Sequence, residues 1–226
     1  MMNIQVKTCG DLQYILRYPR NFTENEKIPV LLYLHGSGTR GKAPEEVIET
    51  DSFTVTAKLE NFPFLMVAPL CPPNATWYDY MPNLKALVSE ISALPYADTS
   101  RFYGMGASMG GYGLWQLAMS IPEAFAAIVP ICGGGMYWNT KRLINVPVWA
   151  FHGGKDMTVL PEESEKMVNK LNKLGGNAKL TIYPENTHNA WTDTYSNQAV
   201  FDWLLSHTNQ NDRDTADVFT DAKIYG

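Results

Sequence analysis

The sequence predicts an α/β protein with a mostly parallel central sheet of about eight strands and helices on both faces. Short apolar runs rich in β-branched and aromatic residues recur at residues 30–34, 64–68, 101–105, 126–131, 148–151 and 179–183. Helical patterns separate several of these runs, and such alternation forms parallel βαβ units. Two runs near the amino terminus, residues 4–7 and 13–18, predict an antiparallel hairpin at one edge of the sheet.

The predicted helices have their own signals. Apolar residues spaced three and four apart fall on one face of residues 84–94 and 167–174. Pro122 ends a helix that begins near Met109, and residues 200–205 indicate a last helix.

Composition favours one globular domain. The chain has 226 residues, 45% of them hydrophobic and 12% aromatic, which is enough to bury a core. We expect a domain over residues 1–207 and a polar tail over residues 208–226. The formal net charge of −5, without a basic run, gives no electrostatic reason to bind nucleic acid or an anionic membrane. No apolar run approaches the roughly 18 residues of a membrane span.

Other features concern compartment and assembly. Cys9, Cys71 and Cys132 are widely spaced and odd in number, which predicts reduced thiols rather than disulfides or a metal site. No signal peptide pattern is visible, so we expect a cytoplasmic protein, or a secreted one if an export signal has been removed. No pattern indicates an oligomeric state.

Residues 104–113, Gly-Met-Gly-Ala-Ser-Met-Gly-Gly-Tyr-Gly, place Ser108 in a Gly-x-Ser-x-Gly pattern between a predicted strand and a predicted helix. A serine at such a sharp turn has strained backbone dihedrals, and side chains two positions away would collide with strand and helix. Gly106 and Gly110 remove those side chains. The helix N-terminus favours a developing negative charge. The pattern predicts a nucleophile, although alone it also fits a glycine-rich loop.

The chain has four histidines, so the partner of Ser108 is sought by elimination. His35 and His152 each end a predicted strand before glycine, and we expect both to be structural histidines that bond loop backbone. His207 follows the last helix and is expected to be a surface or capping residue. His188 alone lies in a loop after the last predicted strand, where a catalytic histidine is expected.

Asp156 is the expected acid, because it lies just past the predicted strand 148–151. The alternative is that it caps the helix near Pro161. Asp193 and Glu185 are fallback acids, but both lie close in sequence to His188. The order serine, aspartate, histidine is that of an α/β-hydrolase triad, and all three follow the carboxyl ends of strands.

This triad predicts acyl transfer. His188 would accept the Ser108 proton, Asp156 would orient the imidazole and stabilise the imidazolium, and water would hydrolyse the acyl-enzyme. We expect the oxyanion to be bound by two backbone N–H groups, those of Met109 and Ser37.

Four motifs together resemble the esterase branch of the α/β-hydrolase superfamily. They are Leu-Tyr-Leu-His-Gly-Ser-Gly at 32–38, Ala-Pro-Leu-Cys-Pro at 68–72 with Trp77, the serine motif at 106–113, and Pro-Ile-Cys-Gly-Gly-Gly at 130–135. Within it, residues 28–206 are most similar to feruloyl-esterase-like and polyhydroxybutyrate-depolymerase-like serine esterases, some of them labelled peptidases. The resemblance implies carboxylic ester hydrolysis by Ser108, Asp156 and His188, with no cofactor and no metal.

The site is expected to be open. Only residues 132–146 separate two strands between which many relatives insert a helical cap, and fifteen residues are too few for a cap domain. Aromatic and apolar side chains are expected to form pocket walls suited to a sugar ring or a phenolic acyl group, unless half of them are core residues. They are Trp77, Tyr78, Met136, Tyr137, Trp138 and Trp191.

We therefore expect a serine carboxylesterase that acts on small acyl or aryl esters, with feruloyl, acetyl and carbohydrate-linked esters as candidate substrates. One alternative is a serine peptidase with the same triad, although nothing in the sequence resembles a propeller or another gating domain. The other is a catalytically silent hydrolase fold that binds a ligand. Loss of a triad residue would have favoured it, and none is lost.

Overall fold

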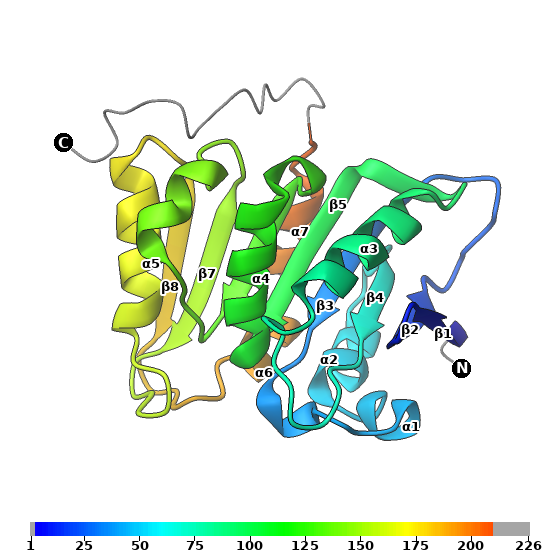
Figure 1. Cartoon of the computed structure of the whole chain (residues 1–226), viewed down its shortest axis with the longest axis horizontal. Helices are drawn as coiled ribbons and strands as arrows, with labels where there is room; N and C mark the ends of the chain where they lie inside the picture. Colours follow the sequence, from blue (N-terminus) through cyan, green and yellow to red (C-terminus); the bar gives the residue numbers. More distant parts are fainter. Residues whose placement is uncertain (1–2, 210–226) are drawn as a thin grey trace.

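One sheet of eight strands runs through the molecule in the order β1-β2-β4-β3-β5-β6-β7-β8 (Figure 1). The computed structural model describes residues 3–209, so most of the expected tail, residues 210–226, lies outside the described residues. The strands are β1 (Asn3–Cys9), β2 (Leu12–Tyr18), β3 (Ile28–Leu34), β4 (Leu65–Pro69), β5 (Ala97–Ala107), β6 (Ala127–Ile131), β7 (Val148–Gly153) and β8 (Ala178–Tyr183).

The predicted mostly parallel sheet with an antiparallel hairpin at its edge is confirmed. β1 and β2 pair antiparallel, β2 also pairs antiparallel with β4, and the other neighbours are parallel. The carboxyl ends of β5, β6, β7 and β8 therefore meet at one edge of the sheet, where loops from these strands can bring side chains together.

Helices cover both faces of the sheet (Figure 1). The helical elements are η1 (Ser37–Thr39), α1 (Pro44–Val47), α2 (Asp51–Thr54), η2 (Thr56–Lys58), α3 (Met81–Ser92), α4 (Met109–Ser120), η3 (Pro122–Ala124), η4 (Tyr137–Leu143), α5 (Glu162–Lys173), α6 (Trp191–Ser196) and α7 (Gln198–Leu205). Residues of α3, α4 and α5 share one apolar cluster, and residues of α1, α2, α6 and α7 share the other. Within residues 3–209, no helix is long and apolar enough to span a membrane.

Strand β3 shows why the apolar runs are continuous rather than alternating. Val30, Leu32 and Leu34 belong to the cluster under α3, α4 and α5, whereas Leu31 and Tyr33 belong to the cluster on the opposite face. Successive side chains of a strand point to opposite faces, and here both faces are covered.

Two parts of the fold differ from the expectation. Strand β5 is longer than residues 101–105, because its first residues pair with Ile28 and Pro29 across a register shift. The short elements η1, α1, α2 and η2 were not predicted, because one helical turn is too short to show a periodic pattern. Between β6 and β7 the chain forms only η4, as expected for a segment too short for a cap.

Helix α4 approaches the end of β3 very closely. A Cβ atom on Gly110 would lie 1.8 Å from the Leu34 carbonyl oxygen, and one on Gly106 would lie 2.3 Å from the carbonyl oxygen of Gly110. Between these glycines, Ser108 has φ 54° and ψ −119°. This conformation costs a non-glycine residue about 1–3 kcal/mol, so the strained turn expected at this serine is present.

Replacing Gly110 by alanine should lower the free energy of unfolding by about 3 kcal/mol, because the new Cβ must push α4 away from β3. Gly38→Ala is the matched control, since a Cβ there meets nothing within 4 Å. Its effect should stay within about 0.5 kcal/mol. Urea unfolding followed by tryptophan fluorescence measures both, and equal destabilisation of the two variants would contradict the close packing of α4.

Candidate active site

Three side chains from separate loops form a continuous hydrogen-bonded relay. Ser108 is the N-cap residue of α4, Asp156 follows β7, and His188 follows β8. His188 Nε2 lies 2.8 Å from Ser108 Oγ, and His188 Nδ1 lies 2.7 Å from Asp156 Oδ2. A carboxylate only accepts hydrogen bonds, so Nδ1 carries the hydrogen and Nε2 is free to accept the serine proton.

The Asp156 carboxylate is buried and held at both oxygens. Oδ1 accepts hydrogen bonds from the backbone N–H groups of Thr158 (2.9 Å) and Val159 (3.0 Å). Burial alone would raise the pKa of Asp156, but the hydrogen bonds from His188, Val159 and Thr158 outweigh it and hold the pKa below its usual value. A side chain in this state supplies a fixed negative charge behind His188. It does not cap α5, which begins at Glu162.

The fallback acids have other partners. Glu185 forms an exposed ion pair with Lys155, and Asp193 accepts a hydrogen bond from Asn186. Of the remaining histidines, His35 accepts from the Cys71 N–H through Nε2 and lies 2.8 Å from the Gly36 oxygen through Nδ1. Burial lowers the pKa of His35 to about 4.

His35 therefore bonds loop backbone, as the sequence predicted. His207 is partly exposed and contacts the carbonyl oxygen of Trp203.

The two expected oxyanion donors lie beside Ser108. Met109 is the first residue of α4, and the first N–H groups of a helix have no acceptor within it. A Cβ on Gly36 would lie 3.5 Å from Ser108 Cβ, so the backbone leading into Ser37 runs against the serine. Ser37 likewise opens η1, and it lines the same cavity as Ser108. The arrangement can present two N–H groups to an oxygen bound at Ser108.

A cavity of about 460 Å³ opens next to the relay. Its walls come from the end of β3, from η1, from the start of α2 and from α6. The lining residues are Tyr33, Gly36, Ser37, Gly38, Thr39, Thr50, Asp51, Ser52, Ala107, Ser108, His188, Trp191 and Tyr195. The cavity is therefore rich in hydroxyl groups, with one carboxylate, that of Asp51.

Of the six residues expected to form an aromatic pocket, only Trp191 lines this cavity, and Trp77 lies in the core. Trp77 is fully buried, and its Nε1 donates to the His35 carbonyl oxygen at 2.9 Å. It packs under α4 because Gly113 has no side chain: a Cβ there would lie 2.6 Å from Trp77 Cβ. Trp191 does line the cavity, and its ring meets that of His188 edge-on at 5.4 Å between centroids.

The other four predicted wall residues are not among the residues that line this cavity. Tyr137 and Trp138 begin η4, which packs against α5, and both remain exposed. Tyr78 is also exposed, and Met136 is partly buried. The reason is positional, because the cavity lies on the side of α2 and α6 while these residues lie on the side of α4 and α5.

Sequence reasoning missed the polar wall of the cavity. Tyr33 lies within the apolar strand β3, and nothing in the sequence of this strand indicates that the Tyr33 hydroxyl lies 2.7 Å from the Tyr195 hydroxyl. Thr50 and Asp51 were detectable in principle as a cap and first residue of a helix. No sequence signal indicates that Tyr195, far away in the chain, completes the same wall.

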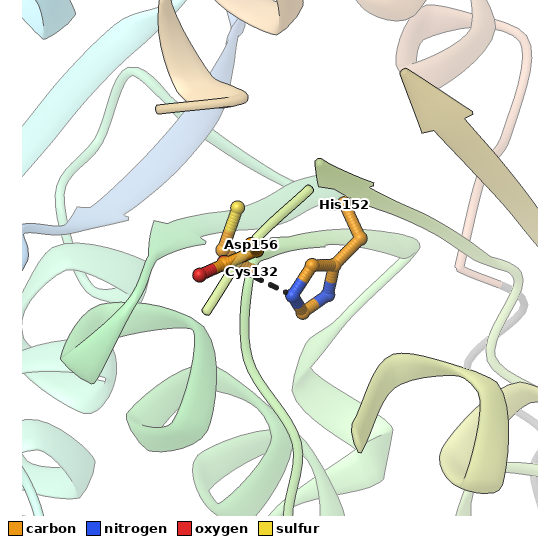
Figure 2. A group of neighbouring side chains, drawn as sticks. All are labelled: Cys132, His152 and Asp156. Atoms are coloured by element: carbon orange, nitrogen blue, oxygen red, sulfur yellow. Dashed lines mark ion pairs between the residues drawn. The ribbon is translucent and has the colours of Figure 1, made fainter. Parts of the chain in front are cut away.

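Cys132, His152 and Asp156 gather behind the relay, with their ligand atoms within 4.8 Å of one another (Figure 2). Each of these atoms already has a protein partner. Asp156 Oδ2 bonds His188, both nitrogens of His152 have partners, and Cys132 Sγ donates to the His188 carbonyl oxygen. A metal ion here would have to displace the hydrogen bond between Asp156 and His188, so the cluster fits a hydrogen-bonded support better than a metal centre.

Known proteins share this architecture. A thermostable esterase matches with a TM-score of 0.76 and 30% identity, over 92% of this chain and 63% of that one. Est1E from Butyrivibrio proteoclasticus, also solved with ferulic acid bound, matches with a TM-score of 0.71 and 17% identity over 90% of this chain and 98% of Est1E. The expected α/β-hydrolase fold is confirmed.

A curated relative is a peptidase. Dipeptidyl-peptidase 5 of Porphyromonas gingivalis is 22% identical over 235 residues, which cover 81% of this chain and 33% of the peptidase. This chain thus spans about a third of the peptidase's length and 63% of the thermostable esterase.

The family model of the dienelactone hydrolases matches residues 75–218, more than half of the chain and including Ser108, Asp156 and His188. On this match and on its fold, the chain belongs to the dienelactone hydrolase family of the α/β-hydrolase superfamily.

Proposed function

We propose that the protein is a serine carboxylesterase that forms an acyl-enzyme on Ser108. The observation that carries the proposal is the relay, in which His188 lies within hydrogen-bond distance of both Ser108 Oγ and Asp156 Oδ2. These distances meet the geometric requirement for a serine activated by a general base that a third group orients.

The reaction follows from these positions. Ser108 Oγ attacks the ester carbonyl carbon while its proton passes to His188 Nε2, and the N–H groups of Met109 and Ser37 stabilise the oxyanion. When the tetrahedral intermediate collapses, the alcohol leaves with the proton from Nε2. Water then attacks the acyl group with His188 again as the base, and the carboxylic acid is released. None of these steps requires a cofactor.

An ester is favoured over an amide by two solved relatives. The thermostable esterase is 30% identical, and Est1E, of nearly the same length, has been solved with ferulic acid. Peptide hydrolysis is the second candidate, because Dipeptidyl-peptidase 5 shares the fold over part of its length. Both reactions use the same relay, so the two candidates are separated by comparing esters with a peptide p-nitroanilide.

The cavity supports a substrate group that bears hydroxyls, such as a sugar or a phenol. Burial raises the pKa of Tyr33 to about 12 and the pKa of Tyr195 well above its usual value, so both hydroxyls stay protonated. Asp51 holds the Thr192 hydroxyl on Oδ2 and lines the cavity with its carboxylate. Hydroxyl groups of a substrate would find donors and acceptors here, whereas a carboxylate would be repelled by Asp51.

Ser108→Ala should lower kcat for p-nitrophenyl acetate by about 10⁴- to 10⁶-fold, because the nucleophile is lost. Ser120→Ala is the matched control at the other end of α4, where the hydroxyl only bonds the Gln116 carbonyl oxygen. It should retain wild-type turnover. Ester hydrolysis at the wild-type rate by Ser108→Ala would refute the mechanism. If the wild-type protein hydrolysed only the peptide p-nitroanilide and none of the esters, it would be a peptidase rather than an esterase.

Asp156→Asn should lower kcat by about 10⁴-fold with little change in KM, since the amide favours the wrong tautomer of His188. Asp193→Asn removes one of the two fallback acids in the same way and should cost less than about threefold. Steady-state kinetics on one ester decides between them. A larger loss in Asp193→Asn would identify the wrong acid.

Asp51→Asn should lower kcat/KM about 10-fold or more for a feruloylated or acetylated sugar, because a hydrogen bond to a charged acceptor is lost. The same variant should leave kcat/KM for p-nitrophenyl acetate within about twofold, since this ester has no hydroxyl group that the carboxylate could accept a hydrogen bond from. The quantity to measure is the ratio of the two kcat/KM values. An unchanged ratio would contradict recognition of hydroxyl groups by Asp51.

A further inference from the structure

A second histidine, unused in the proposed reaction, lies behind the Asp156 carboxylate. His152 stands near the end of β7, and its side chain is fully buried. Its Nε2 atom lies 3.2 Å from Asp156 Oδ2 and 2.9 Å from the Val159 carbonyl oxygen, and Figure 2 shows its ring turned toward Asp156. Its Nδ1 atom lies 2.7 Å from Ser164 Oγ. The sequence predicted a histidine that bonds loop backbone, which describes only the contact with Val159.

The partners of Nε2 determine that it carries a hydrogen. A carbonyl oxygen and a carboxylate both only accept hydrogen bonds, so Nε2 must be the donor to Val159 and Asp156. Asp156 Oδ2 then receives N–H groups from two imidazoles, His188 at 2.7 Å and His152 at 3.2 Å. A carboxylate oxygen has two lone-pair positions, and here each of them has a donor.

His152 is itself tied to the helix that carries the nucleophile. The hydroxyl oxygen of Ser164, buried in α5, lies 2.7 Å from Nδ1 of the ring and 2.9 Å from the Gly133 carbonyl oxygen. Its single hydrogen can be donated to only one of these two acceptors at a time. The Gly133 backbone packs against the first turn of α4, because a Cβ on Gly133 would lie 2.8 Å from the Gly111 carbonyl carbon and the Tyr112 nitrogen.

The contacts therefore form a closed loop that begins and ends at α4. The relay runs from Ser108 through His188 to Asp156, and the support runs from Asp156 through His152, Ser164 and Gly133 back to α4, whose N-cap is Ser108.

We propose that His152 is a positioning residue for Asp156. The Nε2–H group of His152 donates to Asp156 Oδ2 and keeps this oxygen in the position where it accepts the hydrogen bond from His188 Nδ1. Both histidines therefore donate to the same carboxylate oxygen. The proposal rests on the proposed function, because a support for the relay matters only if the relay carries the reaction.

Two consequences distinguish this role from ordinary core packing. Without His152, Oδ2 loses a fixed donor, so the carboxylate can rotate away and productive orientations of His188 become rarer. In the orientations that keep the hydrogen bond from His188, this bond strengthens, because Oδ2 no longer shares its charge between two donors, and protonated His188 becomes more favourable. The first effect lowers kcat, and the second moves the pH dependence of kcat/KM upward.

Other titratable groups near Asp156 do not produce such a change. Cys132 and Tyr112 interact with it electrostatically, and burial raises their pKa values to about 11 and about 12. Both stay neutral across the neutral range. Glu163 lies near the Tyr112 hydroxyl and pairs with Lys166.

The test begins with His152→Phe, which keeps the ring and removes both nitrogens. We expect kcat for p-nitrophenyl acetate to fall about 10- to 100-fold with KM changed less than about threefold. The pH at which kcat/KM is half-maximal should rise by about half a unit or more. Rates are divided by the active-site concentration from the p-nitrophenol burst, so that a misfolded fraction does not count.

Two further variants separate positioning from packing. His152→Gln keeps an amide N–H near the place of Nε2 and should restore the wild-type pH midpoint and most of kcat. Ser164→Ala removes only the hydroxyl that holds Nδ1, and should lower kcat about three- to tenfold with the midpoint moved in the same direction. If His152→Phe does not fold, these two variants carry the test.

The inference is overturned if His152→Phe or Ser164→Ala keeps the wild-type rate per active site and pH midpoint, or if His152→Gln shows the full shift of His152→Phe. Ser108→Ala separates this failure from a failure of the proposed function. An inactive Ser108→Ala beside His152 and Ser164 variants with wild-type profiles rejects only the support, whereas an active Ser108→Ala rejects the relay itself.

Discussion

The site depends on the close approach of α4 to the end of β3. With glycine at positions 106 and 110, the helix can start directly above the strand ends, and Ser108 is forced into a left-handed conformation there. The backbone N–H of Ser108 donates to the Ile131 carbonyl oxygen at 2.8 Å, which ties the turn to β6. Unfavourable backbone dihedrals persist only where the surrounding packing enforces them. The strained conformation of Ser108 is therefore maintained by the packing of α4 against the sheet.

Parallel strands then bring the other two members to the serine. β5, β6, β7 and β8 are successive neighbours in the sheet, and the loops after β7 and β8 supply Asp156 and His188. Cys132, which also has a positive φ, donates through Sγ to the His188 carbonyl oxygen at 3.2 Å. Cys132 therefore holds the backbone of His188, while Asp156 holds its side chain.

The sequence allowed the relay to be predicted, because each member follows the end of a recognisable strand and the elbow glycines have a steric reason. The cavity was predicted poorly. Aromatic content near a motif cannot indicate on which side of the sheet a side chain lies, and Trp77 was assigned to a wall although Gly113 makes room for it in the core. His152 was correctly expected to bond backbone, but its reach to Asp156 is a contact across a loop that no spacing in the sequence specifies.

The proposed support of Asp156 and the cavity lie in different layers of the fold. The support passes through Ser164 of α5 and the first turn of α4, on one face of the sheet. The cavity uses α2 and α6, with Tyr33 and Tyr195 belonging to the apolar cluster of the opposite face. Substitutions at the start of α2 can therefore alter the chemistry of the cavity without disturbing Asp156. Those in α5 would act on the relay without touching the cavity. In the proposed reaction, selectivity and turnover would therefore have separate structural origins.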